Sequence, residues 1–274
     1  MTLNPKNQRD LFTITTAICY ICQNKKMILT NLSVDCVIFG FKNDKLNVLL
    51  WQANPKLLEN FLTTPEEYEQ IKILFEKNPA LGPDNFWGLI GTHLPDNEDL
   101  DSYAKKILKI TTGLNNIYLK QFETFGSIQR VPHFRVVTVA YYALINPDYH
   151  DMKLSPLAKS VKWFNIDELP DVIFDVKEIV LKALKKLREE AQFHPVGFHL
   201  LPKKFTLTQL QTLYEVILGK QLDTRNFRKK IQKMGLLVDT KQKQTHVAHR
   251  AAKLYSFDIQ TYNRLFEEGL HFRI

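Results

Sequence analysis

Cysteine is scarce in this chain. Only Cys19, Cys22 and Cys36 occur among 274 residues, and an odd number without regular spacing does not make a disulfide framework. No second pair or neighbouring histidine completes Cys19 and Cys22 as a metal site. We therefore predict unpaired thiols and a reducing, cytoplasmic setting.

Long apolar runs are also missing. The longest one, residues 11–22, is interrupted by threonines and is too short to span a bilayer core of about 30 Å. No small-residue cleavage site follows it, so it makes a poor signal peptide. Hydrophobic residues nevertheless make up 45% of the chain, which is enough for folded cores. We expect no membrane segment, and an extension of unknown role over residues 1–33.

Acidic residues are few in one part of the chain only. Lysine and arginine exceed aspartate and glutamate by 37 to 29, for a net charge of +8. Residues 195–274 contain fourteen basic and six acidic residues, so the whole excess lies there. This asymmetry indicates a module that binds a polyanion, attached to a neutral domain; a basic tail that serves solubility is the alternative.

Strand and helix patterns alternate through the first part of the chain. The apolar runs 34–41 and 46–50 flank Lys42-Asn43-Asp44-Lys45, which is typical of a hairpin. Gly113 is the expected end of an amphipathic helix. The other expected elements are a helix at 66–76 within a polar insertion, the helix at 100–111, strands at 136–145 and 161–164, and a helix at 175–192 with a basic outer face. We predict an α+β domain over residues 34–193, followed by a linker at 193–197.

Two short helices and a hairpin are expected in the last 80 or so residues. Thr206 is a good N-cap for a helix that ends at Gly219, and Asp223 is a good N-cap for the next. The first helix has a buried stripe of Leu207, Leu210, Leu213, Tyr214 and Ile217. A basic second helix after a tight turn is typical of the helix-turn-helix, and the hairpin follows at 236–257.

The basic residues of this second domain are candidates for binding duplex DNA. They occur on the second helix and again in the hairpin, while acids are nearly absent between them, as phosphate neutralisation requires. A solvated helix face is the alternative. The predicted DNA-binding residues are Arg225, Asn226, Arg228, Lys229, Lys230, Lys233, Lys243 and Arg250.

Several segments together carry a resemblance to a known family. In the first domain they are Trp87-Gly88-Leu89-Ile90-Gly91, Ile107-Leu108, Thr112-Gly113-Leu114, Phe125-Gly126 and Val139-Ala140-Tyr141-Tyr142-Ala143-Leu144. In the second they are Leu201-Pro202-Lys203-Lys204-Phe205-Thr206-Leu207, Leu213-Tyr214-Glu215, Arg225-Asn226-Phe227-Arg228-Lys229-Lys230 and Leu254-Tyr255-Ser256-Phe257. With these, the chain resembles the Nudix-related transcriptional regulators of bacteria over about residues 34–260. The resemblance implies a Nudix-like α/β/α sandwich followed by a winged helix-turn-helix domain over 194–274.

The resemblance also implies a degenerate catalytic signature. Nudix hydrolases have Gly, five residues, Glu, seven residues, then Arg-Glu-apolar-x-Glu-Glu-x-Gly-apolar. Anchored on Gly113-Leu114, this pattern places its residues at Thr92, Glu98, Lys106, Ile107, Ile110 and Thr111, so that only Glu98 is retained. Isoleucine cannot hold the divalent metal that polarises a phosphoryl group. We expect no catalytic residue, no metal and no cofactor.

An inactive hydrolase fold that keeps its cleft is suited to sensing a ligand. The resemblance implies a sugar or a nucleotide-like metabolite, and Thr92 in place of glycine favours the sugar slightly. The candidate effector-binding residues are Trp87, His93, Arg130, His133, Arg135 and Tyr141. A structural role is the alternative for each.

We therefore predict an effector-responsive bacterial transcription regulator that binds operator DNA. A homodimer is expected, because a single winged helix makes few base contacts and bacterial operators are commonly palindromic. A divergent Nudix phosphohydrolase with metal ligands from elsewhere in the chain, fused to a nucleic-acid-binding domain, is one alternative. An RNA-binding or scaffold protein is the other.

Overall fold

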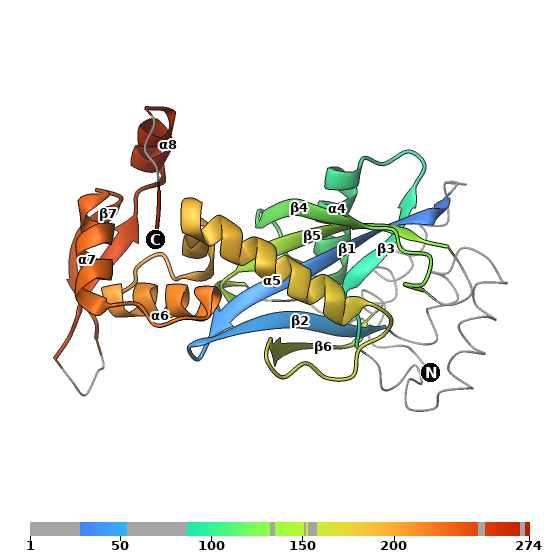
Figure 1. Ribbon diagram of the computed structural model, residues 1–274, viewed down its shortest axis with the longest axis horizontal. Helices are drawn as coiled ribbons and strands as arrows, with labels where there is room; N and C mark the ends of the chain where they lie inside the picture. Colours follow the sequence, from blue (N-terminus) through green and yellow to red (C-terminus); the bar gives the residue numbers. More distant parts are fainter. Residues whose placement is uncertain are drawn as a thin grey trace, which may run out of the picture.

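A six-stranded sheet with helices on both faces leads into a smaller domain of short helices and a two-stranded sheet (Figure 1). The computed structural model describes residues 28–53, 87–131, 135–150, 152, 158–245, 250–268 and 272–274. The α+β architecture expected from the sequence is confirmed. The expected helix at 66–76 lies outside the described residues.

Strand β1 is the centre of the large sheet. The strands are β1 (Ile28–Lys42), β2 (Lys45–Ala53), β3 (Ile90–Pro95), β4 (Tyr118–Phe125), β5 (Val137–Ile145) and β6 (Ala158–Asn165). Their order is β4-β5-β1-β2-β6, and β3 also pairs with β1. β1 runs parallel to β5 and antiparallel to β2 and β3. The sheet is therefore mixed, with its longest strand shared by three partners.

The hairpin between β1 and β2 forms where its turn residues predict it. Asn43 and Asp44 both have positive φ, 53° and 56°, as a two-residue turn that matches the strand twist requires. Lys42 pairs directly with Lys45 across the turn. The prediction of a hairpin here is confirmed, and β1 itself begins at Ile28, before the expected Val34.

The two faces of the sheet are covered by different helices. Helix α4 (Leu100–Thr112) packs with Cys36 and Ile38 of β1, whereas α5 (Val176–Phe193) packs with Val37 and Phe39. This alternation follows from the two-residue period of a strand. The helix at 100–111 ends, as expected, at a left-handed Gly113 with φ of 75°. The result is a three-layer α/β/α sandwich.

The second domain has the caps that the sequence predicts. Its elements are the 3-10 helix η3 (Val196–Leu200), helices α6 (Leu207–Leu218), α7 (Thr224–Lys233) and α8 (Ile259–Glu267), and strands β7 (Leu237–Lys243) and β8 (Lys253–Phe257). Thr206 and Gln209 form a reciprocal capping box on α6. Gly219 ends α6 with φ of 65°, and the Asp223 side chain caps α7.

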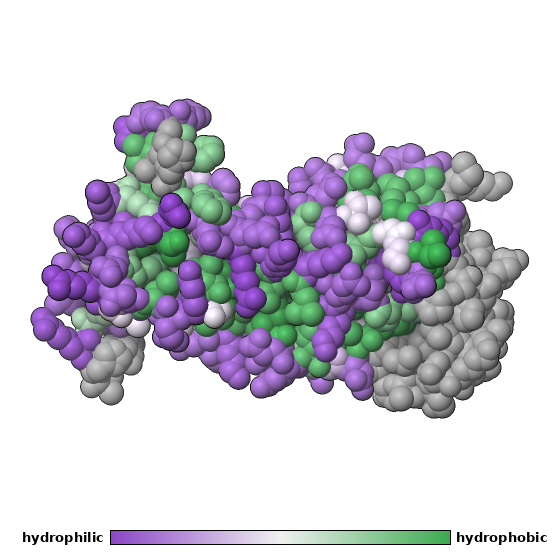
Figure 2. All heavy atoms as spheres, in the orientation of Figure 1, coloured by the Kyte–Doolittle hydropathy of each residue, from purple (hydrophilic) through white to green (hydrophobic). Residues whose placement is uncertain are grey.

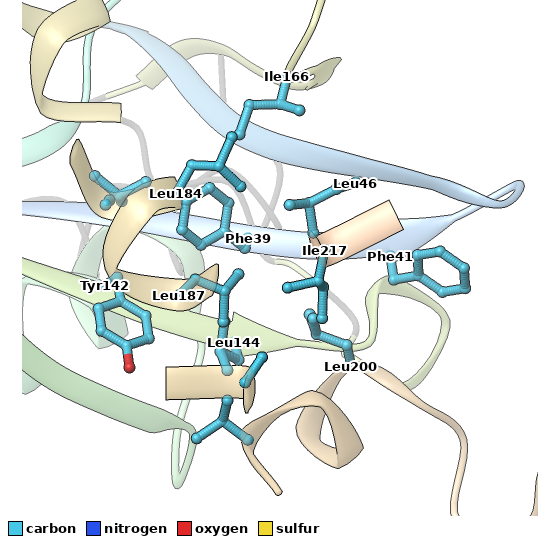
Figure 3. Close-up of a cluster of buried hydrophobic side chains, with 14 of the residues drawn as sticks. Phe39, Phe41, Leu46, Tyr142, Leu144, Ile166, Leu184, Leu187, Leu200 and Ile217 are labelled. Carbon is cyan, nitrogen blue, oxygen red and sulfur yellow. The ribbon is translucent and has the colours of Figure 1, made fainter. Parts of the chain in front are cut away.

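The junction between the domains is packed. Val196 and Gly197, expected within a linker, are buried. Ile217 of α6 lies near Leu46 and Phe41 of the β1–β2 hairpin and near Leu200 of η3 (Figure 3). One hydrophobic core therefore runs from the sheet and α5 into the second domain.

Strand β4 and helix α8 are absent from the sequence-based expectations. β4 alternates poorly and is mostly half-exposed, and α8 has no fully buried residue. A further short 3-10 helix, η2, covers Pro147–Tyr149. Among the described residues, no helix is long and apolar enough to cross a membrane.

Candidate functional site

Helix α7 turns one face into the core and the opposite one outward. Phe227 and Ile231, one turn apart, are buried, so the side chains on the opposite side of the helix reach the surface. The surface there is a shallow depression of about 810 Å³ lined by Asp223, Thr224, Arg225, Arg228, Lys229, Gln232 and Lys233. Figure 2 shows mostly hydrophilic side chains over the end of the molecule that carries α7. The depression is a strongly basic surface.

Two of the predicted DNA-binding residues lie on α7 outside this depression. Asn226 and Lys230 are exposed but do not line it. The backbone N–H of Asn226 donates to Asp223 Oδ1 at 2.8 Å, so this residue also takes part in the helix cap. The structure therefore brings Arg225, Arg228, Lys229 and Lys233 together and sets Asn226 and Lys230 apart from them.

Arg228 joins the two helices of the helix-turn-helix. Its Nη2 donates to Thr208 Oγ1 in the first turn of α6, at 3.2 Å. Arg225 and Lys229 are exposed, whereas Arg228 is half-buried. Arg228 is thus positioned both to face the depression and to hold α7 against α6.

The β7–β8 hairpin supplies more positive charge. Lys243 pairs across the hairpin with Lys253, and both lysines and Arg250 are exposed. Asp239 is the acid among them: its Oδ1 accepts from the Lys241 N–H at 2.8 Å. This hydrogen bond holds the pKa of Asp239 below its usual value. The hairpin keeps a basic surface around one ionised carboxylate, which Lys241 and Lys253 accompany at 3.6 Å.

A second concave surface lies at the other end of the molecule, against α5. This groove has a volume of about 1100 Å³ and lies between the end of β4, the turn after it, and the N-terminal half of α5. It is lined by Thr124, Phe125, Gly126, Ser127, Gln129, Arg130, Ile173, Phe174, Asp175, Lys177, Glu178, Leu181, Lys182 and Lys185. Phe174 and Leu181 are 37% and 48% exposed. The α5 groove thus combines lysines with an exposed ring.

Arg130 is the most buried charge of the α5 groove. Its Nε and Nη2 donate to the two carboxylate oxygens of Asp175 at 2.8 and 3.0 Å, and its Nη1 donates to Thr138 Oγ1. The Arg130 side chain is only 6% exposed. Asp35 Oδ2 lies 4.0 Å from Nη2. Burial raises the pKa of Asp35 to about 6, although Arg130 acts in the opposite direction.

Lys182 crosses the same groove. Its Nζ donates to Glu123 Oε1 at 2.7 Å and lies 3.2 Å from Glu178 Oε1. It is also 4.8 Å from the centroid of the Phe125 ring. The bonds to Glu123 and Glu178 raise the pKa of Lys182. The side chain is therefore a fixed cation over an aromatic ring.

Two comparisons with known proteins agree with this arrangement. Residues 197–257 match the family model of the NrtR DNA-binding winged helix domain. The chain is also 30% identical over 207 residues to the ADPR responsive transcriptional repressor NtrR of Acinetobacter baylyi, a match that covers 74% of this chain and 82% of that protein. The chain belongs to the NrtR family of transcriptional regulators.

Solved structures of NrtR proteins have the same architecture. Shewanella oneidensis NrtR in complex with a 27mer DNA has a TM-score of 0.62 at 26% identity, covering 85% of this chain and 95% of that one. A second crystal structure of Shewanella oneidensis NrtR has a TM-score of 0.64 at 27% identity, covering 83% and 94%. A MutT/nudix family protein of Enterococcus faecalis shares the fold, with a TM-score of 0.60 at 20% identity over 94% and 100%. The prediction of a regulator with a Nudix-like sensor domain and a DNA-binding winged helix is confirmed.

In this NrtR-family chain the effector candidates do not all converge. Arg130 lines the α5 groove, and Arg135 lies at its edge, where Nη1 donates to the Gly126 carbonyl at 2.5 Å. Tyr141 is on the opposite face of the sheet and donates to Asp101 Oδ1 at 2.5 Å. Trp87 is buried 4.7 Å from the Phe164 ring, and His93 pairs with Ser33 in the sheet. His133 lies outside the described residues.

Sequence reasoning missed the lysines and Phe174 of the α5 groove. The basic outer face of the helix at 175–192 was the available signal, but a basic face is also what a solvated helix has. Only the packing of α5 beside β4 turns Lys177, Lys182 and Lys185 toward one concave surface.

At the Nudix signature positions of this chain, the side chains pack in the core or form an ion pair. Glu98 Oε1 and Lys106 Nζ form an ion pair of 2.5 Å between the loop and α4. Ile107 and Thr111 are buried, and Thr111 Oγ1 donates to the Ile107 carbonyl at 2.7 Å. The described part of the chain holds no group of three or more His, Cys, Asp or Glu residues suited to a metal ion.

Proposed function

We propose that this regulator is a repressor that binds operator DNA through α7 and the β7–β8 hairpin, and whose affinity for DNA falls when an ADP-ribose-like dinucleotide occupies the α5 groove. The observation that carries this proposal is the basic depression on α7 within a domain that matches the NrtR winged helix. The response to ADP-ribose is supported by the A. baylyi relative, which is an ADPR responsive repressor.

The chemistry of the α5 groove suits such a dinucleotide. Phe174 offers an exposed ring on which adenine can stack. Lys177 and Lys185 are exposed cations for a diphosphate, and Glu178 is an acceptor for ribose hydroxyls. The groove, about 1100 Å³, is slightly larger than the roughly 300–1,000 Å³ usual for small-molecule sites. The two exposed lysines, Lys177 and Lys185, favour a diphosphate over the sugar that Thr92 suggested.

The residues of α7 divide by their position along the recognition helix. Arg225 lies in the first turn, the part that usually reaches base edges, and arginine pairs bidentately with guanine. Asn226 is the next residue of the same turn, although it does not line the depression. Arg228, Lys229, Lys230 and Lys233 lie further along, where phosphates are the expected partners, as they are for Lys243 and Arg250 of the hairpin.

The proposal includes a homodimer, in which two copies of α7 read the two halves of a palindromic operator. It also includes the domain division made from the sequence, with an extension at 1–33, a sensor at 34–193 and a winged helix at 194–274. The proposal also places the protein in the cytoplasm, because the operator DNA of a bacterium is located in the cytoplasm.

We also propose that the sensor domain does not hydrolyse its ligand. Ile107, Ile110 and Thr111 occupy the positions where a Nudix hydrolase has metal-binding glutamates. The isoleucines offer no oxygen ligand, and the buried Thr111 hydroxyl is engaged by the Ile107 carbonyl. Glu98 is engaged by Lys106. A divergent phosphohydrolase is the alternative function, and it requires metal ligands from other parts of the chain.

The proposal is tested by fluorescence anisotropy with a duplex that the full-length protein selects from a random library. We expect ADP-ribose to weaken this complex at least tenfold, while AMP and ribose 5-phosphate, the two halves of the ligand, have little effect. If ribose 5-phosphate alone gives the full response, the effector is a sugar phosphate. Binding of structured RNA in preference to duplex would contradict the assignment to DNA.

A further inference from the structure

Helix α5 belongs to both functional regions. Its residues from Lys177 to Lys185 line the α5 groove, and its C-terminal half packs against α6 of the helix-turn-helix. With 18 residues the helix is roughly 27 Å long. In Figure 1 it lies across the sheet and ends beside α6. Helix α5 therefore connects the groove directly to the DNA-binding domain.

Arg188 makes a directional contact from α5 to α6. Its Nε donates to the carbonyl oxygen of Ile217 at 2.8 Å. This carbonyl is among the last four of α6, which have no partner within their own helix, and a cation is favourable at that end of a helix. The hydrogen bond thus fixes the C-terminal end of α6 to one turn of α5.

The same guanidinium lies against the turn that leads into α7. Gly219 ends α6, and a Cβ built there would lie 3.1 Å from Arg188 Nη2. The turn from Gly219 to Asp223 then connects directly to the recognition helix. Arg188 therefore contacts both the end of α6 and the beginning of this turn.

Apolar packing at the junction makes the connection stiff. Leu184 and Leu187 of α5 and Ile217 of α6 belong to one buried cluster (Figure 3). Close-packed interiors change between discrete arrangements and do not deform continuously. This packing keeps α5 and α6 together, and the hydrogen bond from Arg188 adds the directional contact between them.

A separate network holds the last turns of α5 to the sheet. Glu190 is 8% exposed and accepts from Lys120 Nζ at 2.7 Å and from the Tyr142 hydroxyl at 3.1 Å. Lys120 and Tyr142 belong to β4 and β5. Arg188 and Glu190 thus tie neighbouring residues of one helix to the helix-turn-helix and to the sensor sheet, respectively.

We propose that Arg188 is the positioning residue that couples the α5 groove to the recognition helix. The inference rests on the proposed function, namely that an effector in the groove weakens DNA binding. A ligand that shifts α5 displaces Arg188, which carries the end of α6, the turn and α7 with it. Arg188 lines neither the groove nor the depression on α7, so its removal uncouples the two sites without touching either ligand.

Two substitutions separate the hydrogen bond from the bulk of the side chain. Arg188→Gln places an amide nitrogen at the position of the arginine Nε and keeps a donor. Arg188→Met has similar length and no donor. Glu189→Gln, an exposed neighbour on the same helix, is the matched control.

The measurement is the affinity of each full-length protein for the selected duplex, with and without saturating ADP-ribose, and the affinity for ADP-ribose without DNA. For a wild-type coupling of about tenfold or more, we expect Arg188→Met to reduce the ratio below about threefold while ADP-ribose affinity stays within twofold. Arg188→Gln and the control should retain most of the ratio. If the methionine variant melts below the assay temperature, Arg188→Leu, an uncharged side chain without a donor, replaces it.

An unchanged ratio in Arg188→Met, or equal losses in Arg188→Gln and Arg188→Met, would overturn the role of the hydrogen bond. A wild-type protein whose DNA affinity ignores ADP-ribose would instead contradict the proposed function. These two failures are distinguishable because the first is read only from the variants.

Discussion

Arg130 and Asp175 form a doubly hydrogen-bonded ion pair, with distances of 2.8 and 3.0 Å, where α5 begins beside the groove. Both side chains are largely buried, at 6% and 12% exposed. Such a pair depends on both members, because removal of one leaves the other as an uncompensated charge.

Arg130→Ala is therefore expected to destabilise the fold strongly. The substitution leaves Asp175 and the nearby Asp35 without their cation, and breaking a buried pair costs about 3–5 kcal/mol. Urea unfolding followed by circular dichroism measures the change. Arg130→Ala combined with Asp175→Asn should recover part of the loss, and a loss below about 1 kcal/mol in the single variant would mean that the pair behaves as an exposed one.

Asp35 predicts a pH dependence of stability. Its pKa is raised to about 6 from 3.8, so the folded protein holds a proton between these values that the unfolded chain releases. Stability contributed by this group is therefore present at low pH and is lost as pH rises from about 4 to about 6. Asp35→Asn should flatten that part of the profile. If the stability of the wild type and of Asp35→Asn changes by the same amount over this pH range, the assignment is contradicted.

The lysines of the α5 groove should contribute to effector affinity. Lys177→Ala and Lys185→Ala each remove an exposed cation from the lining, and we expect each to weaken ADP-ribose binding by about three- to tenfold, equivalent to roughly 0.7–1.4 kcal/mol. Isothermal titration calorimetry measures the affinity of each protein for ADP-ribose. Lys109→Ala, on α4 at the other face of the sheet, is the control and should change nothing. Equal effects from all three would indicate general electrostatics in place of a site.

Purified protein with magnesium should release no phosphate or nucleoside monophosphate from ADP-ribose. The reason is the loss of carboxylates at Ile107, Ile110 and Thr111. The check is product analysis by chromatography over a long incubation. Metal-dependent turnover that disappears in Glu98→Gln would revive the phosphohydrolase.

The sequence predicted those elements whose signals are local. Asn43 and Asp44 favour a tight turn, and Thr206, Gly219 and Asp223 favour helix ends at the positions where the structure has them. β4 was missed because its sequence mixes polar and apolar residues without strict alternation. Its place at the sheet edge depends on pairing with β5, which is a non-local contact.

The candidate site was predictable only in part for the same reason. The α7 cations occur on one short helix, so helical spacing brings them together. The α5 groove instead needs β4, a turn and α5 side by side, and of the five effector candidates within the described residues only Arg130 lines it. Tyr141 shows the difficulty: the two-residue period of a strand does not tell which face a residue takes, and Tyr141 faces α4.

The central claim is that the α7 face reads DNA, and two substitutions test it most directly. Arg225→Ala and Lys229→Ala are compared on the selected duplex and on a scrambled one, with a melting curve for each protein and a salt series. Arg225→Ala should cost about 1–3 kcal/mol on the selected duplex and little on the scrambled one, because direct readout is lost. Lys229→Ala should weaken both duplexes equally and reduce the salt slope by about 0.9, as the loss of one phosphate contact requires. Equal weakening of both duplexes by Arg225→Ala, with a lowered melting temperature, would instead show that Arg225 only supports the turn at Asp223 and would contradict the account.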